Sequence, residues 1–195
     1  MTTDTALQSE RLILEKINAS QAEDFKRALC DPKVYQHIDT SCPTLSELHD
    51  FLRELEGGPP KHQVDEFWHD FAVRRTADRQ LIGRLEASII SANAEVSYLF
   101  GSDFWGQGYA SESLHCLQRF INNNHHVTSY WACISPSNLR SIKLIKLIKL
   151  IERIERIERM GYSEASPKSW PSLITYDSGD RVFQNQGPWN SSKVC

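Results

Sequence analysis

Apolar and polar positions alternate along the first part of the chain in a pattern that predicts a strand followed by a helix. Residues 11–17, RLILEKI, alternate as a half-buried strand does. Ser20 and Glu23 have the spacing of a capping box, which predicts a helix that starts there and runs to about Leu29. Asp31-Pro32 is expected to end that helix, because the residue before proline avoids helical geometry.

A second helix is predicted from Thr44, with Glu47 as its capping-box partner. The pair of glycines at 57–58, followed by two prolines, is expected to terminate this helix. Its apolar residues recur at helical spacing and would form one buried stripe: Leu48, Phe51, Leu52 and Leu55.

A run of strands follows and predicts an antiparallel meander. The expected strands are residues 71–76, 81–90 and 95–100, joined by short turns. Beyond them the pattern predicts a helix over about 110–121, a strand over 128–134 and a last hairpin formed by 173–176 and 181–183. Helices and strands are mixed and no linker divides them, so we expect one α/β domain over residues 1–195, with a core over about 9–185.

Composition narrows the classes of function. The net charge is −3 and the 22 lysines and arginines are spread out, so we expect no nucleic-acid partner. No apolar run reaches the length of a membrane span, and the N-terminus lacks the apolar centre of a signal peptide. The five cysteines are odd in number and have no CxxC spacing, so we expect reduced thiols and a cytoplasmic location.

The stretch YLFGSDFWGQGYASES, residues 98–113, places a glycine-containing loop between a strand and a helix. Gly106 and Gly108 permit close approach of a ligand, the first amides of the helix point outward, and Ser111 adds a hydroxyl. The segment is neither a P-loop nor a dinucleotide fingerprint, because GK[ST] and GxGxxG are missing. It is either a cradle for a pyrophosphate or an ordinary tight turn.

This loop resembles the acyl-CoA loop of the GNAT superfamily of N-acetyltransferases, whose pattern is [QR]-x-x-G-x-[GA]. Gly108-Tyr109-Ala110 fills G-x-A, whereas Trp105 occupies the leading slot, as in the ribosomal-protein N-terminal acetyltransferase branch. Three more stretches resemble that branch: SERLIL at 9–14, AEVSYLF at 94–100 and SNLRSIKL at 137–144. The resemblance covers about residues 9–165.

The resemblance implies a central, mainly antiparallel mixed sheet, splayed between the strands that end near Phe100 and Ile134, with helices on both faces. It implies an acyltransferase that moves acetyl from acetyl-CoA to a primary amine by direct attack, without a metal. The acceptor would be a protein N-terminus or a small molecule, and a homodimer is among the expected states. The alternative is a catalytically weak acyl-CoA-binding sensor or interaction protein, since Trp105 departs from the general pattern and the usual tyrosine slot holds Ile145.

The resemblance also assigns the reacting groups. By this resemblance Glu95 is the first candidate for the base. Glu86 is the reserve on its own setting, a mid-strand glutamate between Leu85 and Ala87, where a raised pKa is expected; either could be a solvated strand charge. Ser141 occupies the position that protonates the CoA sulfur, or it is a hydroxyl that satisfies the helix start. Asn138 would bind pantetheine or cap the helix. The other residues expected at acetyl-CoA are Tyr98, Leu99 and Phe100 through their backbones, and Gly106, Gln107, Gly108, Tyr109, Ala110 and Ser111.

Two further groups of residues are read as structural. Cys133 lies in a predicted strand, and a buried thiol is favoured there over an acyl-cysteine intermediate. His125 and His126 follow three asparagines without a third ligand nearby, which favours a solvated loop over a metal site.

Residues 141–162 read SIKLIKLIKLIERIERIERMGY, an anomalous repeat of triplets over 143–160. Removing two IKL and two IER units brings Asn138, Ser141 and Gly161-Tyr162 to the spacing of the resembled family. A period of three turns each successive isoleucine by about −60° on an α-helix, so the isoleucines wind around it. We therefore interpret the repeat as a tandem expansion or a fault in the sequence record, rather than as an interaction helix, and expect a regular helix over only part of 141–160.

Overall fold

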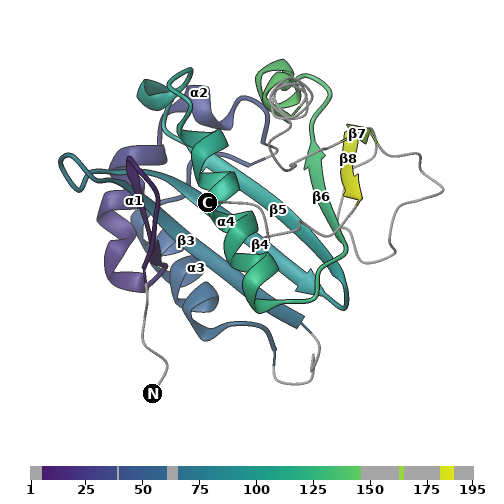
Figure 1. Ribbon diagram of the computed structural model, residues 1–195. Helices are drawn as coiled ribbons and strands as arrows, with labels where there is room; N and C mark the ends of the chain where they lie inside the picture. The colour runs from purple at the N-terminus through teal and green to yellow at the C-terminus, as the bar shows by residue number, and fades with distance from the viewer. Residues whose placement is uncertain (1–5, 39, 61–65, 146–162, 165–180, 187–195) are drawn as a thin grey trace.

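The computed structural model describes residues 6–38, 40–60, 66–145, 163–164 and 181–186, the last two segments as backbone (Figure 1). Its centre is an eight-stranded mixed sheet in the order β1-β2-β3-β4-β5-β6-β8-β7. The strands are β1 (Leu7–Gln8), β2 (Leu12–Lys16), β3 (Glu66–Arg75), β4 (Leu81–Ile90), β5 (Asn93–Phe100), β6 (Ser129–Ile134), β7 (Ser163–Glu164) and β8 (Arg181–Gln186).

Neighbouring strands pair antiparallel everywhere except between β5 and β6, which run parallel. That parallel pairing covers only three positions, from Asn93 with Ser129 to Glu95 with Trp131. Beyond Glu95 the two strands separate, and Figure 1 shows them moving apart. The predicted mixed, splayed sheet is therefore confirmed, and its opening lies beside the second half of β5.

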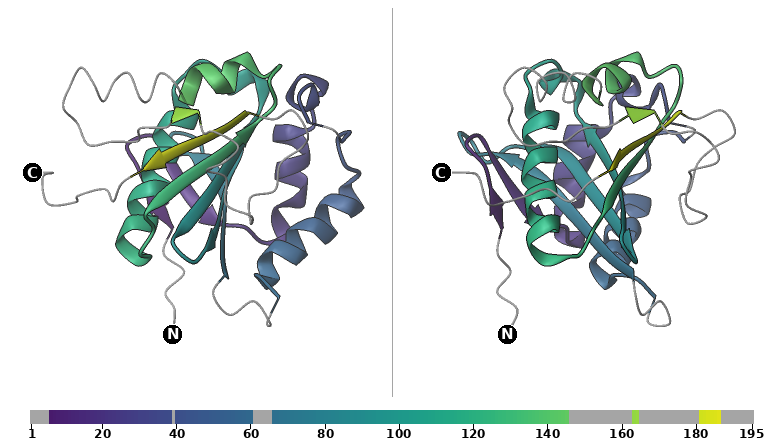
Figure 2. Two further views of the ribbon diagram at one scale, coloured as in Figure 1. Left: turned by 90° about the vertical axis from the view of Figure 1, so that its right-hand side faces the viewer. Right: turned by 45° about the vertical axis from the view of Figure 1, so that its right-hand side comes forward.

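Helices cover both faces of the sheet. Helices α1 (Ala22–Leu29) and α3 (Leu45–Gly57) lie on one side and α4 (Tyr109–Asn124) on the other, as Figure 2 shows. A short helix α2 (Pro32–Tyr35) joins α1 to α3, and a further helix begins at residue 139 and is described as far as residue 145.

Two apolar clusters hold these layers together, one on each face. The larger cluster lies under α4, where Leu85, Val96 and Tyr130 of the sheet pack against Leu117 and Ile121. The smaller cluster lies under α1 and α3 and includes Phe25, Leu52 and Ala72. Because side chains alternate between the faces of a strand, the central strands β3, β4 and β5 supply residues to both clusters. Within β5, Val96, Tyr98 and Phe100 face α4, whereas Leu99 faces α1.

The first helix begins differently from the prediction. Asn18, not Ser20, is the N-cap: its side chain accepts hydrogen bonds from Ser20, and Gln21 completes the capping box. A 3-10 turn, η1 (Ala19–Gln21), precedes α1, so the predicted box of Ser20 and Glu23 is wrong. The helix does end at Leu29.

The residues after Leu29 start a new helix. Proline is favoured in the first turn of a helix, where its missing N–H leaves no bond unmade. Pro32 accordingly opens α2, and the Asp31 side chain caps it by accepting from the Lys33 N–H at 2.9 Å.

The second predicted helix and the meander are confirmed with small shifts of boundary. Thr44 and Glu47 form the predicted capping box of α3, and Gly58 takes a positive φ of 71° after its last turn. Strand β3 begins at Glu66, five residues before the predicted start, and pairs with β4 from that residue, which lies opposite Ile90.

Helix α4 is longer than predicted and continues through the three asparagines to Asn124. His125 follows as its C-cap, and its Nε2 lies 2.7 Å from Nε2 of His69 on β3. The prediction that His125 lies in a solvated loop is wrong, because the ring packs against His69 and Phe67. Of the predicted last hairpin, strand 181–183 is confirmed within β8, whereas 173–176 and the repeat from residue 146 lie outside the described residues.

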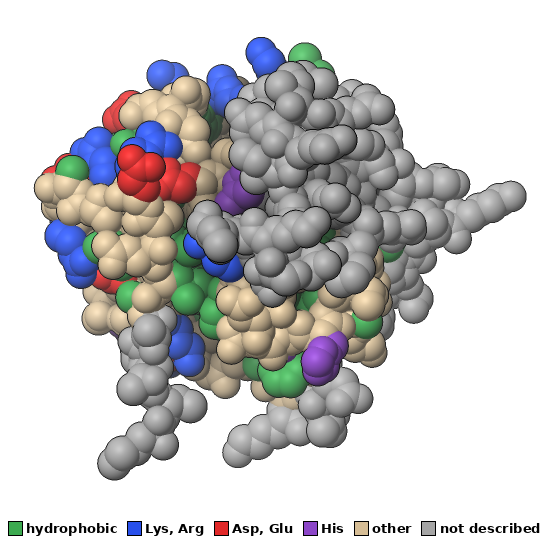
Figure 3. Space-filling view, viewed as in Figure 1, with side chains coloured by type: hydrophobic (Ala, Val, Ile, Leu, Met, Phe, Trp, Pro, Cys, Tyr) green, Lys and Arg blue, Asp and Glu red, His purple; other side chains and the backbone are tan. Residues whose placement is uncertain are grey.

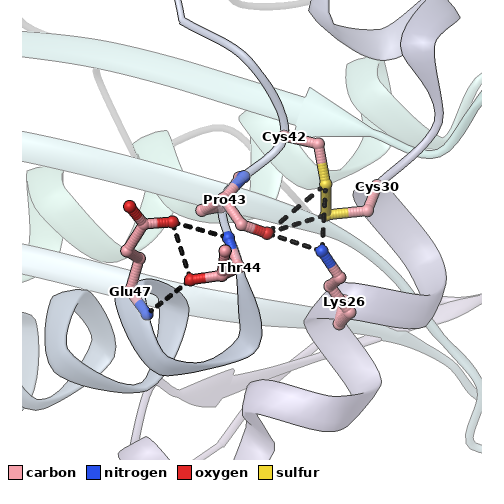
Figure 4. Close-up of a disulfide and its surroundings, with 6 residues drawn as sticks. All are labelled: Lys26, Cys30, Cys42, Pro43, Thr44 and Glu47. Atoms are coloured by element: carbon pink, nitrogen blue, oxygen red, sulfur yellow. Dashed lines mark hydrogen bonds between the residues drawn. A yellow bond between two sulfur atoms is a disulfide. The ribbon is translucent and has the colours of Figure 1, made fainter.

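The cysteine prediction is corrected at two positions. Cys30 and Cys42 form a disulfide that connects the end of α1 to the segment before α3 (Figure 4). Spacing alone did not suggest the pair, because twelve residues separate the two cysteines and the turn through α2 brings their Cα atoms to 5.3 Å. Cys116 is a buried thiol outside this disulfide, and Cys133, also outside it, is partly buried. The expectation of reduced thiols throughout is wrong, so the cysteines no longer support a cytoplasmic location.

Within the described part of the chain, no helix is both long and apolar enough to cross a membrane.

Candidate functional site

The glycine loop lies where β5 ends and α4 begins. Its first turn, η2 (Ser102–Phe104), is followed by Trp105, whose indole N–H donates to the Phe100 carbonyl at 2.8 Å. The Gln107 side chain donates back to the Asp103 carbonyl, also at 2.8 Å. These two hydrogen bonds fix the loop at the end of β5.

Gly106 and Gly108 both have left-handed backbone angles, with φ of 74° and 82°. Residues with side chains adopt that region rarely, so glycine is favoured at both positions. A Cβ at Gly106 would meet no atom within 4 Å, which means that this part of the loop faces open space. Gly108 is the N-cap of α4 and, having no side chain, leaves the first amides of the helix without a side-chain cap.

A charged network supports the loop from beneath. Arg11, just before β2, donates through Nη1 to the Gln107 carbonyl at 3.0 Å and lies over the Tyr109 ring. Its Nε and Nη2 contact Glu112 of the first turn of α4 at 2.7 Å. Figure 3 shows acidic and basic side chains together at the upper left, where Figure 1 places the β1–β2 turn and the start of α4.

The pKa of Glu112 reflects this network. Burial alone would raise it, but hydrogen bonds from the Arg11 N–H, the Ser9 hydroxyl and the Arg11 guanidinium lower the pKa below its usual value. Glu112 is therefore charged at neutral pH, and Arg11 neutralises it. The start of α4 thus keeps the positive end of its helix dipole available to an anion, despite an acidic residue in its first turn.

The helix over residues 139–145 follows β6, the strand on the other side of the splay from β5. Asn138 caps that helix, since its Oδ1 accepts from the Ser141 N–H at 3.1 Å. The Arg140 guanidinium lies 3.9 Å from the centre of the Trp105 ring, a cation–π contact that joins this helix to the glycine loop. Trp105 departs from the general sequence pattern of the resembled family. It contacts the helix over 139–145 through Arg140 and the end of β5 through the Phe100 carbonyl.

Two hydroxyl groups approach one another inside the splay. Tyr98 of β5 and Ser141 face each other, and Ile142 and Ile145 pack into the same cluster. The Tyr98 Oη atom is buried and makes no hydrogen bond with any described residue. Burial raises the pKa of Tyr98 to about 12, an effect that the neighbouring Ser141 hydroxyl opposes.

The candidate bases lie on the other face of the sheet. Glu86 accepts from the Ser97 hydroxyl at 2.8 Å and pairs with the Arg84 guanidinium. Glu95 is two residues before Ser97 on β5, opposite Ser88, and shares that face by strand alternation. Neither carboxylate lies on the face that carries α4, the glycine loop and Ser141.

Asp70 is a functional candidate that the sequence reasoning missed. It lies directly across from Glu86 in the β3–β4 pairing. Burial, the nearby Glu86 carboxylate and, in the opposing direction, Arg84 together raise the pKa of Asp70 to about 7. Its signal was an acidic residue in the apolar stretch FWHDFAV, but the predicted strand began one residue later and left it out.

The candidate residues therefore lie on both faces of the sheet, close to the splay between β5 and β6. The glycine loop, Tyr98 and Ser141 lie on the α4 side, and the carboxylates of Glu86 and Asp70 lie on the α1–α3 side. Beyond Glu95 no parallel pairing is recorded between β5 and β6, so the second half of β5 lies between these two groups of side chains. Such a division suits a reaction between two substrates that arrive from opposite faces.

A separate hollow lies between α1 and the β3–β4 turn. Its charged walls already pair with one another: Arg74 contacts Glu15 and Asp24, both at 2.8 Å, and Arg79 contacts Glu15 at 2.9 Å. These contacts tie β2, β3 and α1 together and leave no charge free for a ligand, so the hollow is structural. Among the described residues no three acidic, histidine or cysteine side chains gather as a metal site.

Comparison with known proteins gives consistent matches. A family model of the acetyltransferase (GNAT) domain matches residues 11–150. The uncharacterized N-acetyltransferase p20 of Bacillus licheniformis is 27% identical over 142 residues, which span 71% of this chain and 78% of that protein.

Solved structures share the fold. A GNAT-family acetyltransferase from Bacillus anthracis superposes with a TM-score of 0.67 at 17% identity, covering 93% of this chain and 98% of its own. An acetyltransferase from Salmonella typhimurium that modifies the N-terminal serine of 50S ribosomal subunit protein L7/L12 superposes with a TM-score of 0.65 at 14% identity, covering 93% and 99%.

Proposed function

The chain belongs to the GNAT acetyltransferase family and is an acyltransferase; from that premise we propose that it transfers acetyl from acetyl-CoA to a primary amine by direct attack. The observation that supports the proposal is the start of α4, which follows the end of β5. It has no side-chain cap, and the loop before it contains two glycines with left-handed backbone angles. Helix starts of this kind bind phosphate groups through free amides and the helix dipole.

Acetyl-CoA fits this end of the molecule. Its pyrophosphate would lie on the loop from Gly106 to Ser111, where Gly106 faces open space and Arg11, close to Gly108, offsets the charge of Glu112. The pantetheine arm would follow the unpaired edge of β5 along the backbones of Tyr98, Leu99 and Phe100. The bound molecule supplies the activated acetyl group as a thioester.

The amine would approach from the face that carries α1 and α3 and reach the thioester carbon through the splay. A protonated amine has no lone pair with which to attack, so it must first lose a proton. Glu95, on β5 itself, remains our first candidate for the acceptor of that proton. Glu86 is the reserve, and its hydrogen bond to Ser97 connects it to β5.

For the acceptor we propose a protein N-terminus, because a fold relative modifies the N-terminal serine of a ribosomal protein. The test is release of free thiol from acetyl-CoA in the presence of peptides with serine or alanine at the N-terminus, with polyamines and amino acids as the comparison set. Turnover with the peptides alone supports this acceptor. Turnover with a small amine alone replaces it, and binding of acetyl-CoA without turnover of any amine favours a sensor.

Two pairs of variants test the placement of groups. Gly108→Asp adds a side chain at a left-handed position and a negative charge beside the pyrophosphate, so calorimetry should show a large loss of acetyl-CoA affinity. Unchanged affinity would remove the loop from the site. Glu95→Gln should lower kcat more than it changes the affinity for acetyl-CoA. If Glu86→Gln lowers kcat and Glu95→Gln does not, Glu86 is the base.

A further inference from the structure

We propose that the Tyr98 hydroxyl donates the hydrogen bond that stabilises the leaving thiolate, a role taken by strand β5 because the helix carries isoleucine at 145. The inference rests on the proposed function and adds to it a residue that contacts the reacting atoms. In the resembled family a tyrosine usually occupies the position that is Ile145 here, and Ile145 is 0% exposed.

The position of Tyr98 along β5 carries the first step. Parallel pairing with β6 ends at Glu95, so Tyr98 lies three residues into the stretch where the strands have separated. Its side chain points to the face of α4 and the glycine loop, the face assigned to acetyl-CoA. A thioester held along β5 and anchored at Gly108 therefore brings its sulfur to this part of the splay.

The state of the hydroxyl carries the second step. A buried tyrosine normally finds a hydrogen-bond partner, because a buried polar group without one destabilises the fold. The Tyr98 Oη is buried and has no partner among the described residues, although the Ser141 side chain faces it. A ligand atom would satisfy this donor, and on the proposed placement of acetyl-CoA along β5 the sulfur is that atom.

The chemistry defines the role as that of a donor that keeps its proton. The amine lone pair attacks the carbonyl carbon, the C–S bond breaks and its electron pair goes to sulfur, while the proton of the amine goes to the carboxylate or to water. Burial raises the pKa of Tyr98 to about 12, whereas an ordinary thiol has a pKa of about 8.5. Transfer of the phenolic proton to sulfur is therefore unfavourable, and CoA leaves as a thiolate that accepts a hydrogen bond.

Ser141 faces the phenol and is placed to support it rather than replace it. Its backbone N–H is held by the Asn138 side chain at 3.1 Å, which fixes the first turn of the helix against Tyr98. The Ser141 side chain is close enough to affect the pKa of Tyr98, but the two side chains form no hydrogen bond in this structure. A water or the substrate sulfur between the two hydroxyls would accept a hydrogen bond from each.

The experiment compares Tyr98→Phe with Tyr130→Phe. Tyr130 is a buried tyrosine of the same apolar cluster, but its hydroxyl already donates to Asn122 at 2.6 Å, so its loss reports a structural role. The readout is the pKa of the thiol of bound CoA, followed by the ultraviolet absorbance of the thiolate. The wild-type protein and Tyr130→Phe should hold that pKa about 1–2 units below the value for free CoA, since hydrogen bonds to charged groups contribute about 1.5–3 kcal/mol.

Tyr98→Phe should return the thiol pKa to that of free CoA and lower kcat by up to about 10–10²-fold, the factor equivalent to that shift of pKa. Its affinity for desulfo-CoA, which lacks the sulfur, should match that of the wild-type protein. Its thermal stability should not fall, because the variant removes an unsatisfied buried hydroxyl. If the thiol pKa of CoA bound to Tyr98→Phe stays as low as in the wild-type protein, the inference alone is overturned, whereas failure of the wild-type protein to bind desulfo-CoA overturns the proposed function and this inference with it.

Discussion

Replacing Glu112 by alanine should destabilise the protein through the contact between the β1–β2 hairpin and α4. Glu112 accepts from the Ser9 hydroxyl and the Arg11 N–H, both at 2.8 Å, and from the Arg11 guanidinium at 2.7 Å. About a hundred residues separate the two sides of this contact along the chain, so it holds the first strands against the helix that carries the glycine loop.

The magnitude follows from the number of bonds and their exposure. Each hydrogen bond to a buried charged group contributes about 1.5–3 kcal/mol to the free energy of unfolding. Arg11, however, is 44% exposed and recovers water when its partner is removed, which makes the guanidinium bond worth much less. We expect a loss of about 2–3 kcal/mol, which lowers Tm by about 4–12 °C in a domain of this size.

The pH dependence gives the sign of the effect. The pKa of Glu112 is lowered in the folded protein, so its contribution is complete above the usual value of about 4.5 and is lost as pH falls through the folded pKa. The stability difference between the wild-type protein and Glu112→Gln should therefore shrink below pH 4.5 and be nearly constant from pH 5 to 8.

Urea and thermal unfolding followed by circular dichroism measure both effects. Glu10→Ala is the matched control, because Glu10 is an exposed acidic residue of the same turn. If Glu112→Ala and Glu10→Ala unfold at the same urea concentration, or if the effect of Glu112→Gln is the same at pH 3 as at pH 7, the network does not stabilise the fold and the reasoning is refuted.

Three other changes test the fold. Gly101→Ala should cost about 1–3 kcal/mol in urea unfolding, because its Cβ would lie 2.4 Å from the Ala28 carbonyl oxygen; a variant as stable as wild type would show that α1 moves freely. His69 has its pKa lowered to about 4 by burial and by His125, so it opposes folding as pH falls from 6.5 toward 4, and His69→Phe should lose less stability than wild type over that range; parallel curves would contradict this. Replacing Cys30 and Cys42 by serine should lower stability by about 2–4 kcal/mol, the effect of opening a short disulfide loop, and a reductant should then have no further effect; equal stability with and without reductant in the wild type would show that the link is not formed.

Local patterns predicted most of the elements because their causes are local. The capping box of Thr44 and Glu47 and the glycine at 58 define α3 through bonds between near neighbours. The same reasoning misplaced the start of α1, since Asn18 and Ser20 both offer a capping side chain and only the path from β2 selects Asn18. Boundaries shift where two local solutions compete.

Contacts distant in sequence were beyond such patterns. Arg11 and Glu112, Cys30 and Cys42, and His69 and His125 are partners only because the sheet and α2 bring their elements together. No spacing in the sequence records the distance across strands. The same holds for Asp70, whose pKa depends on Glu86 in the neighbouring strand.

The sequence by itself determined the order of elements, the glycine loop and its resemblance to an acyl-CoA loop, because backbone angles and helix starts depend on adjacent residues. Only the tertiary structure decided which face of the sheet each candidate occupies. It separated Glu86 and Asp70 from the loop and set the Tyr98 hydroxyl beside Ser141 without a partner. The reason is that burial and the electrostatic environment of a side chain are set by the elements packed against it, and these come from distant parts of the chain.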